Sequence, residues 1–215
     1  MKIMKRILIF LLIATILLCG ILSIDTGIKS PTPAQAARSY TVQSGDSLWK
    51  IAVRFQVGLS EIINANRHIK NPDLIYPGQV ISIPDAPPFK AMEDEVIRLV
   101  NQERQKRGLH ALSYDWQVAR VARIKSQDMI ENRYFSHTSP IYGSPFNMLK
   151  AFNIRYTVAA ENIAYGQRSA WEVVNVWMNS PGHRQNILNP SVTKIGVGIA
   201  RTYNGVYYFT QIFIR

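Results

Sequence analysis

A proline-rich segment near the middle of the chain separates two stretches with different apolar patterns. Residues 84–90 read PDAPPFK, with three prolines in the first five positions. Proline fixes its φ angle and lacks a backbone N–H, so this segment cannot continue a helix or a central strand and acts as a semi-rigid spacer. Each flanking stretch must therefore bury its own apolar side chains. We predict a small domain at residues 39–84, a linker at 85–90 and a larger domain at 91–215.

The first 36 residues have the features of an export signal. Three basic residues lie within the first six positions, an aliphatic run follows from 7 to 18, and Ala34-Gln35-Ala36 has the small-x-small pattern of a cleavage site. The apolar stretch extends weakly to residue 24, close to the ~20 residues of a membrane span, so an uncleaved anchor is the alternative. We predict a signal peptide over residues 1–36, and no permanent membrane span once it is removed.

The only cysteine, Cys19, falls inside this predicted signal. An exported chain without it has no disulfide and no cysteine nucleophile, so its hydrophobic cores alone must stabilise it. The formal net charge is +11, and because the first 36 residues carry four cations and one anion, the remainder carries +8. This excess suits an anionic bacterial wall or membrane surface, and general solubility explains it equally well. No basic run is interleaved with aromatic residues, so we predict no nucleic-acid partner.

The small domain has the pattern of two strands enclosing two short helices. Residues 39–43 alternate as a strand does, and 80–83 form a second apolar run. Between them, Asp46 or Ser47 can cap a helix with apolar residues at positions 48, 51, 52 and 55, and a second short helix covers 59–66. The expected order is βααβ, with a core that is small for an independent domain.

The segments YTVQSGDSLWKIAVRF, INAN and NPDLIYPGQVISIP closely resemble the LysM module over the whole of residues 39–84. The resemblance implies binding of glycans that contain N-acetylglucosamine, here peptidoglycan, in a shallow groove between two loops. Carried over to this chain, the groove consists of Gly45, Asp46, Ser47, Leu48, Asn71, Pro72, Leu74, Ile75 and Tyr76. Loop amides and a carboxylate can bond acetamido and hydroxyl groups, and the apolar residues can contact the sugar ring. Two readings stay open: Asp46 can serve as a helix cap, and Leu48 and Trp49 suit the core.

The larger domain begins with helical patterns and ends with alternating ones. We expect helices over 90–107, from Ser113 or Asp115 onward, over 144–152 with Pro145 in the first turn, and over 169–182. Residues 194–215 alternate on both sides of Asn204-Gly205, a strong hairpin signal. Helices in front of a late antiparallel hairpin predict an α+β fold.

Several motifs of this domain occur in the order found in the CAP superfamily, which includes cysteine-rich secretory, antigen-five and pathogenesis-related proteins. They are Asn101-x-x-Arg104, YFSHTSP, AENIAYGQ, VWMNSPGHRQNIL and IGVGIA…YYFTQIF. The chain resembles the cysteine-free bacterial branch, which implies a three-layer α-β-α sandwich with an open cleft. His137, Glu161 and His183 match three of the four cleft positions of the family. The fourth, a glutamate three residues after Trp177, is Ser180 here.

The cleft residues admit several kinds of chemistry. Two imidazoles and a carboxylate could hold zinc or another divalent ion, although their spacing carries no metal signature and we expect no required cofactor. A histidine could activate Ser136, Ser139 or Ser180, yet no Gly-x-Ser-x-Gly elbow frames these serines. The three residues could also form a structural polar network. Of the weaker candidates, Glu172 forms a capping box with Ser169, and Asn186 suits a loop-bonding amide.

The sequence thus predicts a monomeric exported protein of the wall or spore envelope, in which the LysM module binds peptidoglycan and the CAP domain binds or scaffolds. The sequence assigns no catalytic residue. The alternative is a metal-dependent or serine-type hydrolase that acts on wall or peptide substrates through His137, Glu161 and His183. Since one fold of this kind serves many functions, the ligand of the CAP domain does not follow from the fold.

Overall fold

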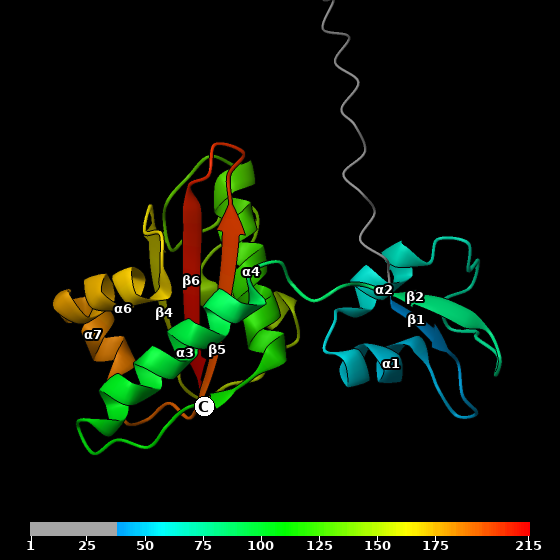
Figure 1. The fold of residues 1–215 in the computed structure, drawn as a ribbon, viewed down its shortest axis with the longest axis horizontal. Helices are drawn as coiled ribbons and strands as arrows, with labels where there is room; N and C mark the ends of the chain where they lie inside the picture. The colour runs from blue at the N-terminus through cyan, green and yellow to red at the C-terminus, as the bar shows by residue number, and fades with distance from the viewer. Residues whose placement is uncertain (1–37) are drawn as a thin grey trace, which may run out of the picture. The chain divides into compact units, whose positions relative to one another are not determined.

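A computed structural model describes residues 38–215 and contains two regions, which Figure 1 colours from blue to red along the chain. The predicted signal peptide lies outside the described residues. In the first region the order is β1 (Arg38–Thr41), α1 (Leu48–Phe55), α2 (Leu59–Ala65) and β2 (Val80–Ile83), and β1 pairs antiparallel with β2. The predicted βααβ order is therefore confirmed, with element bounds that differ by two residues or fewer.

Apolar side chains from both helices, from β2 and from the residue after β1 form the core of this region. They are Val42, Leu48, Ile51, Ala52, Ile62, Ile81 and Ile83. A buried amide links the helices to the sheet: Asn66 donates to the Ile62 and Ser82 carbonyls and accepts from the Ser82 amide. Trp49 was expected near the core and is instead 59% exposed, because it follows Leu48 on α1 and points away from the buried face. Leu48 itself is in the core, as that reading predicted.

The second region contains five helices and a four-stranded sheet. The helices are α3 (Lys90–Gln105), α4 (Trp116–Glu131), α5 (Pro145–Ala151), α6 (Ala170–Asn179) and α7 (Pro181–Ile187), and the strands are β3 (Ser113–Tyr114), β4 (Ala159–Tyr165), β5 (Lys194–Arg201) and β6 (Tyr207–Ile214). The strand order is β3-β5-β6-β4, with β3 parallel to β5 and the other pairs antiparallel. The hairpin predicted around Asn204-Gly205 is the β5–β6 pair.

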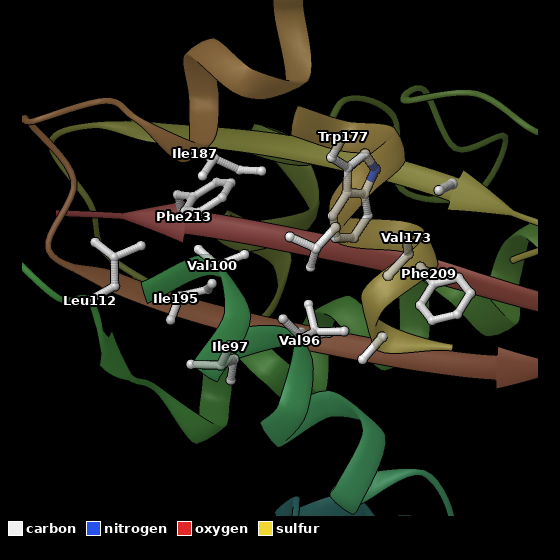
Figure 2. Packing of buried hydrophobic residues seen from close by; sticks show 14 of the residues in the cluster. Val96, Ile97, Val100, Leu112, Val173, Trp177, Ile187, Ile195, Phe209 and Phe213 are labelled. Carbon is white, nitrogen blue, oxygen red and sulfur yellow. The ribbon is translucent and has the colours of Figure 1, made fainter. Parts of the chain in front are cut away.

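Apolar clusters cover both faces of this sheet, which gives the three α-β-α layers that the sequence predicted. On one face α3 and α6 pack onto the strands, and Figure 2 shows Val173 of α6 beside Phe209 of β6 and Ile187 of α7 beside Phe213 of β6. On the other face α4 and α5 cover Ile212 and Ile214. Further residues of the first cluster are Val96, Ile97, Val100, Leu112, Trp177 and Ile195.

Two glycines of β5 explain how closely α4 lies on the sheet. A Cβ atom at Gly196 would lie 2.2 Å from the Ala119 nitrogen, and one at Gly198 would lie 1.9 Å from the Arg123 nitrogen. Any side chain at these positions would therefore collide with the helix backbone. Close packing of α4 matters for function because the loop that follows α4 carries His137.

The Asn101-x-x-Arg104 motif fixes the ends of two elements. Asn101 exchanges two hydrogen bonds with the backbone of Leu112, before β3. The buried guanidinium of Arg104 donates to the carbonyls of His110, Ile187 and Asn189, which lie before β3 and at the end of α7. The motif is therefore structural in this chain, and it ties α3 to α7.

Two elements differ from the sequence-based expectation. The segment AENIAY is strand β4, and Pro181-Gly182 begins α7 and does not open a loop, because proline suits the first helical turn. In consequence Glu161 lies on a strand and His183 on a helix, while His137 lies in the loop after α4. Within residues 38–215, none of the helices combines the length and apolarity that crossing a bilayer requires.

Candidate functional site

The predicted glycan groove of the first region lies where two loops meet beside the β1–β2 pair. Two backbone hydrogen bonds join the loops. The Val42 amide donates to the Gln79 carbonyl, and the Gly78 amide donates to the Val42 carbonyl, both at 2.9 Å. Gly45 and Gly78 both have positive φ angles, which glycine adopts without strain. The two loops therefore face each other in a defined arrangement before any ligand is present.

The side chains of these loops divide into exposed and structural groups. Leu74 and Tyr76 are 51% and 60% exposed, and Ile75 and Pro72 are half-buried. Gly45 and Asn71 are also exposed, and Asn71 accepts the amide of Asp73. Ser47 caps α1 by accepting the Lys50 amide, and the Leu48 side chain lies in the core. Of the predicted groove residues, Leu48 therefore offers no side chain to a glycan.

Asp46 has a structural role in this groove. Its side chain is only 4% exposed. One oxygen accepts the Tyr40 hydroxyl at 2.6 Å and the Gln43 amide at 2.9 Å, and the other accepts Arg54 at 3.2 Å. The hydrogen bond from Tyr40 is the main reason that the pKa of Asp46 is lowered, and the Gln43 amide and the charge of Arg54 act in the same direction. Asp46 thus shapes the loop that carries Gly45, and the cap of α1 is Ser47.

In the second region the structure brings His137 and Glu161 into contact. Nδ1 of His137 lies 2.7 Å from Oε1 of Glu161, across the gap between the loop after α4 and the middle of β4. The His137 side chain is 52% exposed, whereas that of Glu161 is 3% exposed. An ionised Glu161 accepts this bond from Nδ1–H, which leaves Nε2 of His137 as an acceptor toward solvent.

The second carboxylate oxygen of Glu161 has no such partner. Oε2 is buried and makes no hydrogen bond among the described residues. Burial raises the pKa of Glu161, and the hydrogen bond from His137 and the positive charge of Lys125 offset only part of this rise. A buried, half-satisfied carboxyl is costly for folding alone and is characteristic of functional sites.

A buried lysine that the sequence analysis did not single out positions the His137 loop. Nζ of Lys125 donates to the carbonyls of Ser136 at 2.8 Å and His137 at 2.9 Å, and to the Tyr134 hydroxyl at 3.0 Å. Tyr134 in turn donates to Asp128. Burial lowers the pKa of Lys125, which is 1% exposed. The sequence does contain a signal for it, because Lys125 follows Val118 by seven residues and so lies on the same apolar face of α4.

His183 lies near this pair but does not bond to it. Its Nδ1 is buried and without a hydrogen-bond partner in the described part of the chain. Burial lowers the pKa of His183, and the charge of His137 lowers it further. The His183 carbonyl accepts Asn162 Nδ2 at 3.1 Å, so α7 is fixed to β4 through its backbone.

Amides complete the connection between α7 and the sheet. Asn186 donates to the Glu161 carbonyl at 3.2 Å and to the Asn162 side chain at 2.9 Å, and Asn162 also donates to Gln211 of β6 at 3.0 Å. Asn162 and Gln211 are fully buried. Asn186 was expected to bond a loop, and it instead joins helix α7 to strand β4. The sequence-based analysis missed Gln211, whose Nε2 is buried without a partner among residues 38–215.

The weaker candidates have structural roles. The Glu172 amide donates to Ser169 at 3.1 Å, and the Glu172 carboxylate accepts the Arg168 amide at 2.8 Å. This is the predicted capping arrangement with one difference. In the usual capping box the glutamate accepts the amide of the N-cap residue, here Ser169, whereas Glu172 accepts the amide of the residue before it, Arg168. Ser180 lies between α6 and α7 and makes no side-chain cap.

The serine hydroxyls of the His137 loop are engaged locally. The Ser136 hydroxyl accepts the Thr138 amide, and the buried Ser139 hydroxyl accepts those of Ile141 and Tyr142. Neither makes a hydrogen bond with an imidazole in the described residues. Nothing here assigns a nucleophile.

The donor set for a metal ion is incomplete in this arrangement. Nδ1 of His137 and Oε1 of Glu161 are bonded to each other, so the atoms left for a metal ion are the buried Glu161 Oε2 and His183 Nδ1 and the solvent-facing Nε2 of His137. Over residues 38–215, no three His, Cys, Asp or Glu side chains form a group that could hold a metal ion. Zinc binding by His137, Glu161 and His183 therefore stays a prediction. The geometry as it stands supports proton transfer at His137 or binding of a polar ligand beside Glu161.

Comparison with known families and proteins agrees with both sequence resemblances. The family model described as "Cysteine-rich secretory protein family" matches residues 97–213, and the LysM domain model matches residues 40–84. The uncharacterized protein YkwD of Bacillus subtilis is 53% identical over 124 residues, which are 58% of this chain and 47% of that protein. The secreted LysM effector ECP6 of Passalora fulva is 47% identical over 49 residues, 23% of this chain and 22% of that protein.

A solved structure shares the fold of the second region. It is an extracellular protein containing an SCP domain from Bacillus anthracis, with a TM-score of 0.55 and 34% identity, covering 65% of this chain and 47% of that one. The matched part of the chain spans 47% and 34% of the length of two curated relatives from Bacillus subtilis.

Proposed function

Because the chain belongs to the cysteine-rich secretory protein (CAP) family and carries a LysM domain ahead of its CAP domain, we propose that it is an exported, wall-associated protein. The LysM domain binds the N-acetylglucosamine-containing glycan of peptidoglycan and retains the CAP domain there. The CAP domain acts as a binding or scaffolding unit. The extracellular SCP-domain protein and the secreted LysM effector among its relatives support an export route.

One observation carries this proposal: the exposed apolar side chains of the second LysM loop lie beside a first loop that is already bonded in place. Leu74 and Tyr76 are more than half exposed, while Asp46 fixes the opposite loop from within. Such a preorganised surface loses little conformational entropy when a sugar binds. Its backbone amides and exposed aromatic ring suit the acetamido group and the apolar face of N-acetylglucosamine.

Sedimentation with purified peptidoglycan tests the LysM assignment. The full chain should co-sediment, and Tyr76→Ala should weaken binding by about tenfold, the effect of losing roughly 1.4 kcal/mol of contact. Tyr203→Ala is the matched control, because Tyr203 is a fully exposed tyrosine of the CAP domain. If the wild-type chain stays in solution, the proposed retention on peptidoglycan is wrong. If Tyr76→Ala binds like wild type, the assignment of the glycan to this LysM loop is wrong.

A second function, hydrolysis of wall or peptide substrates, has one specific observation in its favour. Glu161 orients the exposed imidazole of His137 and has a raised pKa, an arrangement that can draw a proton from water or a substrate hydroxyl. Release of muropeptides by wild type but not by His137→Ala would support this function. Metal analysis of the same two proteins and of a His137→Ala/His183→Ala variant tests the zinc prediction, and equal metal content in all three would exclude it.

A further inference from the structure

A groove on the CAP domain, away from His137 and Glu161, is formed by α3, α6 and α7. It encloses about 480 Å³. Its floor is apolar and continuous with the core beneath, because Leu99 of α3 packs with Val174 and Met178 of α6. The groove is large enough for one or two sugar rings, and pockets of this size are typical of small-molecule sites.

Trp171 forms one wall of this groove. It lies at the second position of α6 and is 65% exposed, in contrast to Trp177 of the same helix, which is fully buried. Amide side chains surround the hollow at Gln102, Asn175 and Asn179. Trp171 is not part of the core cluster beneath α6, so one face of its indole ring is available to a ligand in the groove. It suits the apolar face of a sugar whose hydroxyl groups bond to the amides.

The rim of the groove is positively charged. Lys106, Arg107 and Arg184 contribute three cations, and Glu103 is the one anion. Glu103 pairs with Lys106 at 2.6 Å and with Arg107 at 2.7 Å, and the hydrogen bond from Lys106 is the main cause of its lowered pKa. Arg184 makes no salt bridge among residues 38–215. The rim therefore keeps a net charge of +2, with Arg184 available to an acidic group.

The position of Arg184 is fixed by the structure beneath it. Arg184 lies on α7, and the buried Arg104 of α3 bonds the Ile187 and Asn189 carbonyls at the end of that helix. Asn186 bonds the same helix to β4. These bonds fix the α7 backbone that carries Arg184 relative to α3, so that its exposed side chain starts from a defined position at one end of the groove.

We propose that this groove binds a disaccharide-peptide unit of peptidoglycan, with a sugar ring on Trp171 and a carboxylate of the attached peptide at Arg184. A guanidinium and a carboxylate form paired, charge-assisted hydrogen bonds. The inference rests on the proposed function to the extent that both sites bind the same polymer. The LysM groove would recognise its neutral acetamido groups and this groove its acidic groups, so that two weak contacts on one chain strengthen each other.

Binding of soluble fragments to the full chain tests this second site. The probes are a disaccharide-peptide from digested peptidoglycan, which carries carboxylates, and tetra-N-acetylglucosamine, which carries none. Titrations are made with Tyr76→Ala in the background, which weakens the LysM contribution to fragment binding. Trp171→Ala and Arg184→Gln should each weaken binding of the disaccharide-peptide by about tenfold or more, and added salt should weaken the parent.

Matched variants separate the groove from general surface effects. Tyr203→Ala controls for loss of an exposed aromatic ring and Arg155→Gln for loss of an exposed cation, and both should bind as the parent does. With an intact Tyr76, Trp171→Ala should leave binding of tetra-N-acetylglucosamine unchanged, so failure of the LysM proposal is visible separately. Equal disaccharide-peptide affinity in the parent, Trp171→Ala and Arg184→Gln would overturn the inference.

Discussion

Asp46 of the LysM domain and Glu161 of the CAP domain are both almost completely buried, yet their surroundings differ. The exposed fractions of the two side chains are 4% and 3%. Asp46 accepts hydrogen bonds from a hydroxyl, an amide and a guanidinium, and its pKa is lowered. Glu161 has one partner, His137, and its pKa is raised. Burial alone therefore does not identify a functional carboxyl, and the number of its partners is the better guide.

The difference extends to what each carboxyl does for the fold. Asp46 connects β1, the first loop and α1 through Tyr40, Gln43 and Arg54, so it stabilises the shape of a binding surface without facing the ligand. In Glu161, by contrast, Oε1 bonds the exposed imidazole of His137, and Oε2 has no hydrogen-bond partner among residues 38–215. Oε2 therefore makes no contact that stabilises the fold. We infer that the LysM domain keeps its polar groups bonded and binds with its backbone and exposed rings, whereas the CAP domain retains an unsatisfied group for a ligand.

Removing the Asp46 side chain should have the largest effect. Asp46→Ala leaves three donors without their acceptor, so the first loop loses its shape. We expect binding of tetra-N-acetylglucosamine to fall by on the order of tenfold, together with the thermal midpoint of the LysM domain. Asp46→Asn is the matched control and should retain most binding, because an amide oxygen can still accept from Tyr40 and Gln43. Full binding by Asp46→Ala would show that the carboxyl does not shape the groove.

Replacing the Glu161 carboxyl should raise the stability of its domain, whereas replacing that of Asp46 should lower it. A carboxyl whose folded pKa is raised favours folding below its unfolded pKa of about 4.5, and this contribution is lost as the pH rises through the folded pKa. Glu161→Gln should therefore stabilise the CAP domain at pH 7, by on the order of 1 kcal/mol, and the gain should vanish below pH 4.5. Denaturant unfolding at several pH values measures it. A destabilised Glu161→Gln at pH 7 would mean that the carboxylate is structural, like Asp46.

His183 should produce a smaller effect, because it is only half-buried. Its pKa is lowered below 6.5 in the folded chain, so its contribution to stability is present above pH 6.5 and is lost as the pH falls through the folded pKa. We expect wild type to lose stability over this range and His183→Gln to lose less. Parallel pH profiles for the two proteins would show that burial of His183 is not linked to folding.

Glu172→Gln should have the smallest effect. Its carboxylate bonds only the Arg168 amide at the start of α6, and glutamine can make the same bond. The unfolding free energy should change by a few tenths of a kcal/mol, with no change in glycan binding. A loss of binding at unchanged stability would instead assign Glu172 a place in a ligand site, beside Trp171 on the same helix.

The sequence predicted most elements of the fold because their patterns are local. Ser47, Asp115, Ser144 and Ser169 cap helices that the apolar spacing indicates, and Asn204-Gly205 marks the last hairpin. Strand β4 was missed because Glu161 and Asn162 interrupt an alternating pattern, and each is buried by contacts with residues far along the chain. These two polar residues are also the ones that build the site.

The site itself could not be worked out from local pattern. The proximity of His137, Glu161 and His183 followed only from the family resemblance, since a loop, a strand and a helix bring them together. Lys125 and Gln211 were missed because their roles depend on carbonyl and amide groups of other elements. A charged or amide side chain on an otherwise apolar stripe is the signal that could have indicated them.

The most direct test of the contrast between the two domains is a carboxyl titration by nuclear magnetic resonance on the full chain. In one labelled sample, Asp46 should titrate below 3.8 and Glu161 above 4.5, the ordinary values of the two residue types. Asp46→Asn and Glu161→Gln assign the two signals. A Glu161 midpoint at or below 4.5 would contradict the account, because the carboxyl would then be as well satisfied as Asp46 and no unsatisfied group would remain for a ligand.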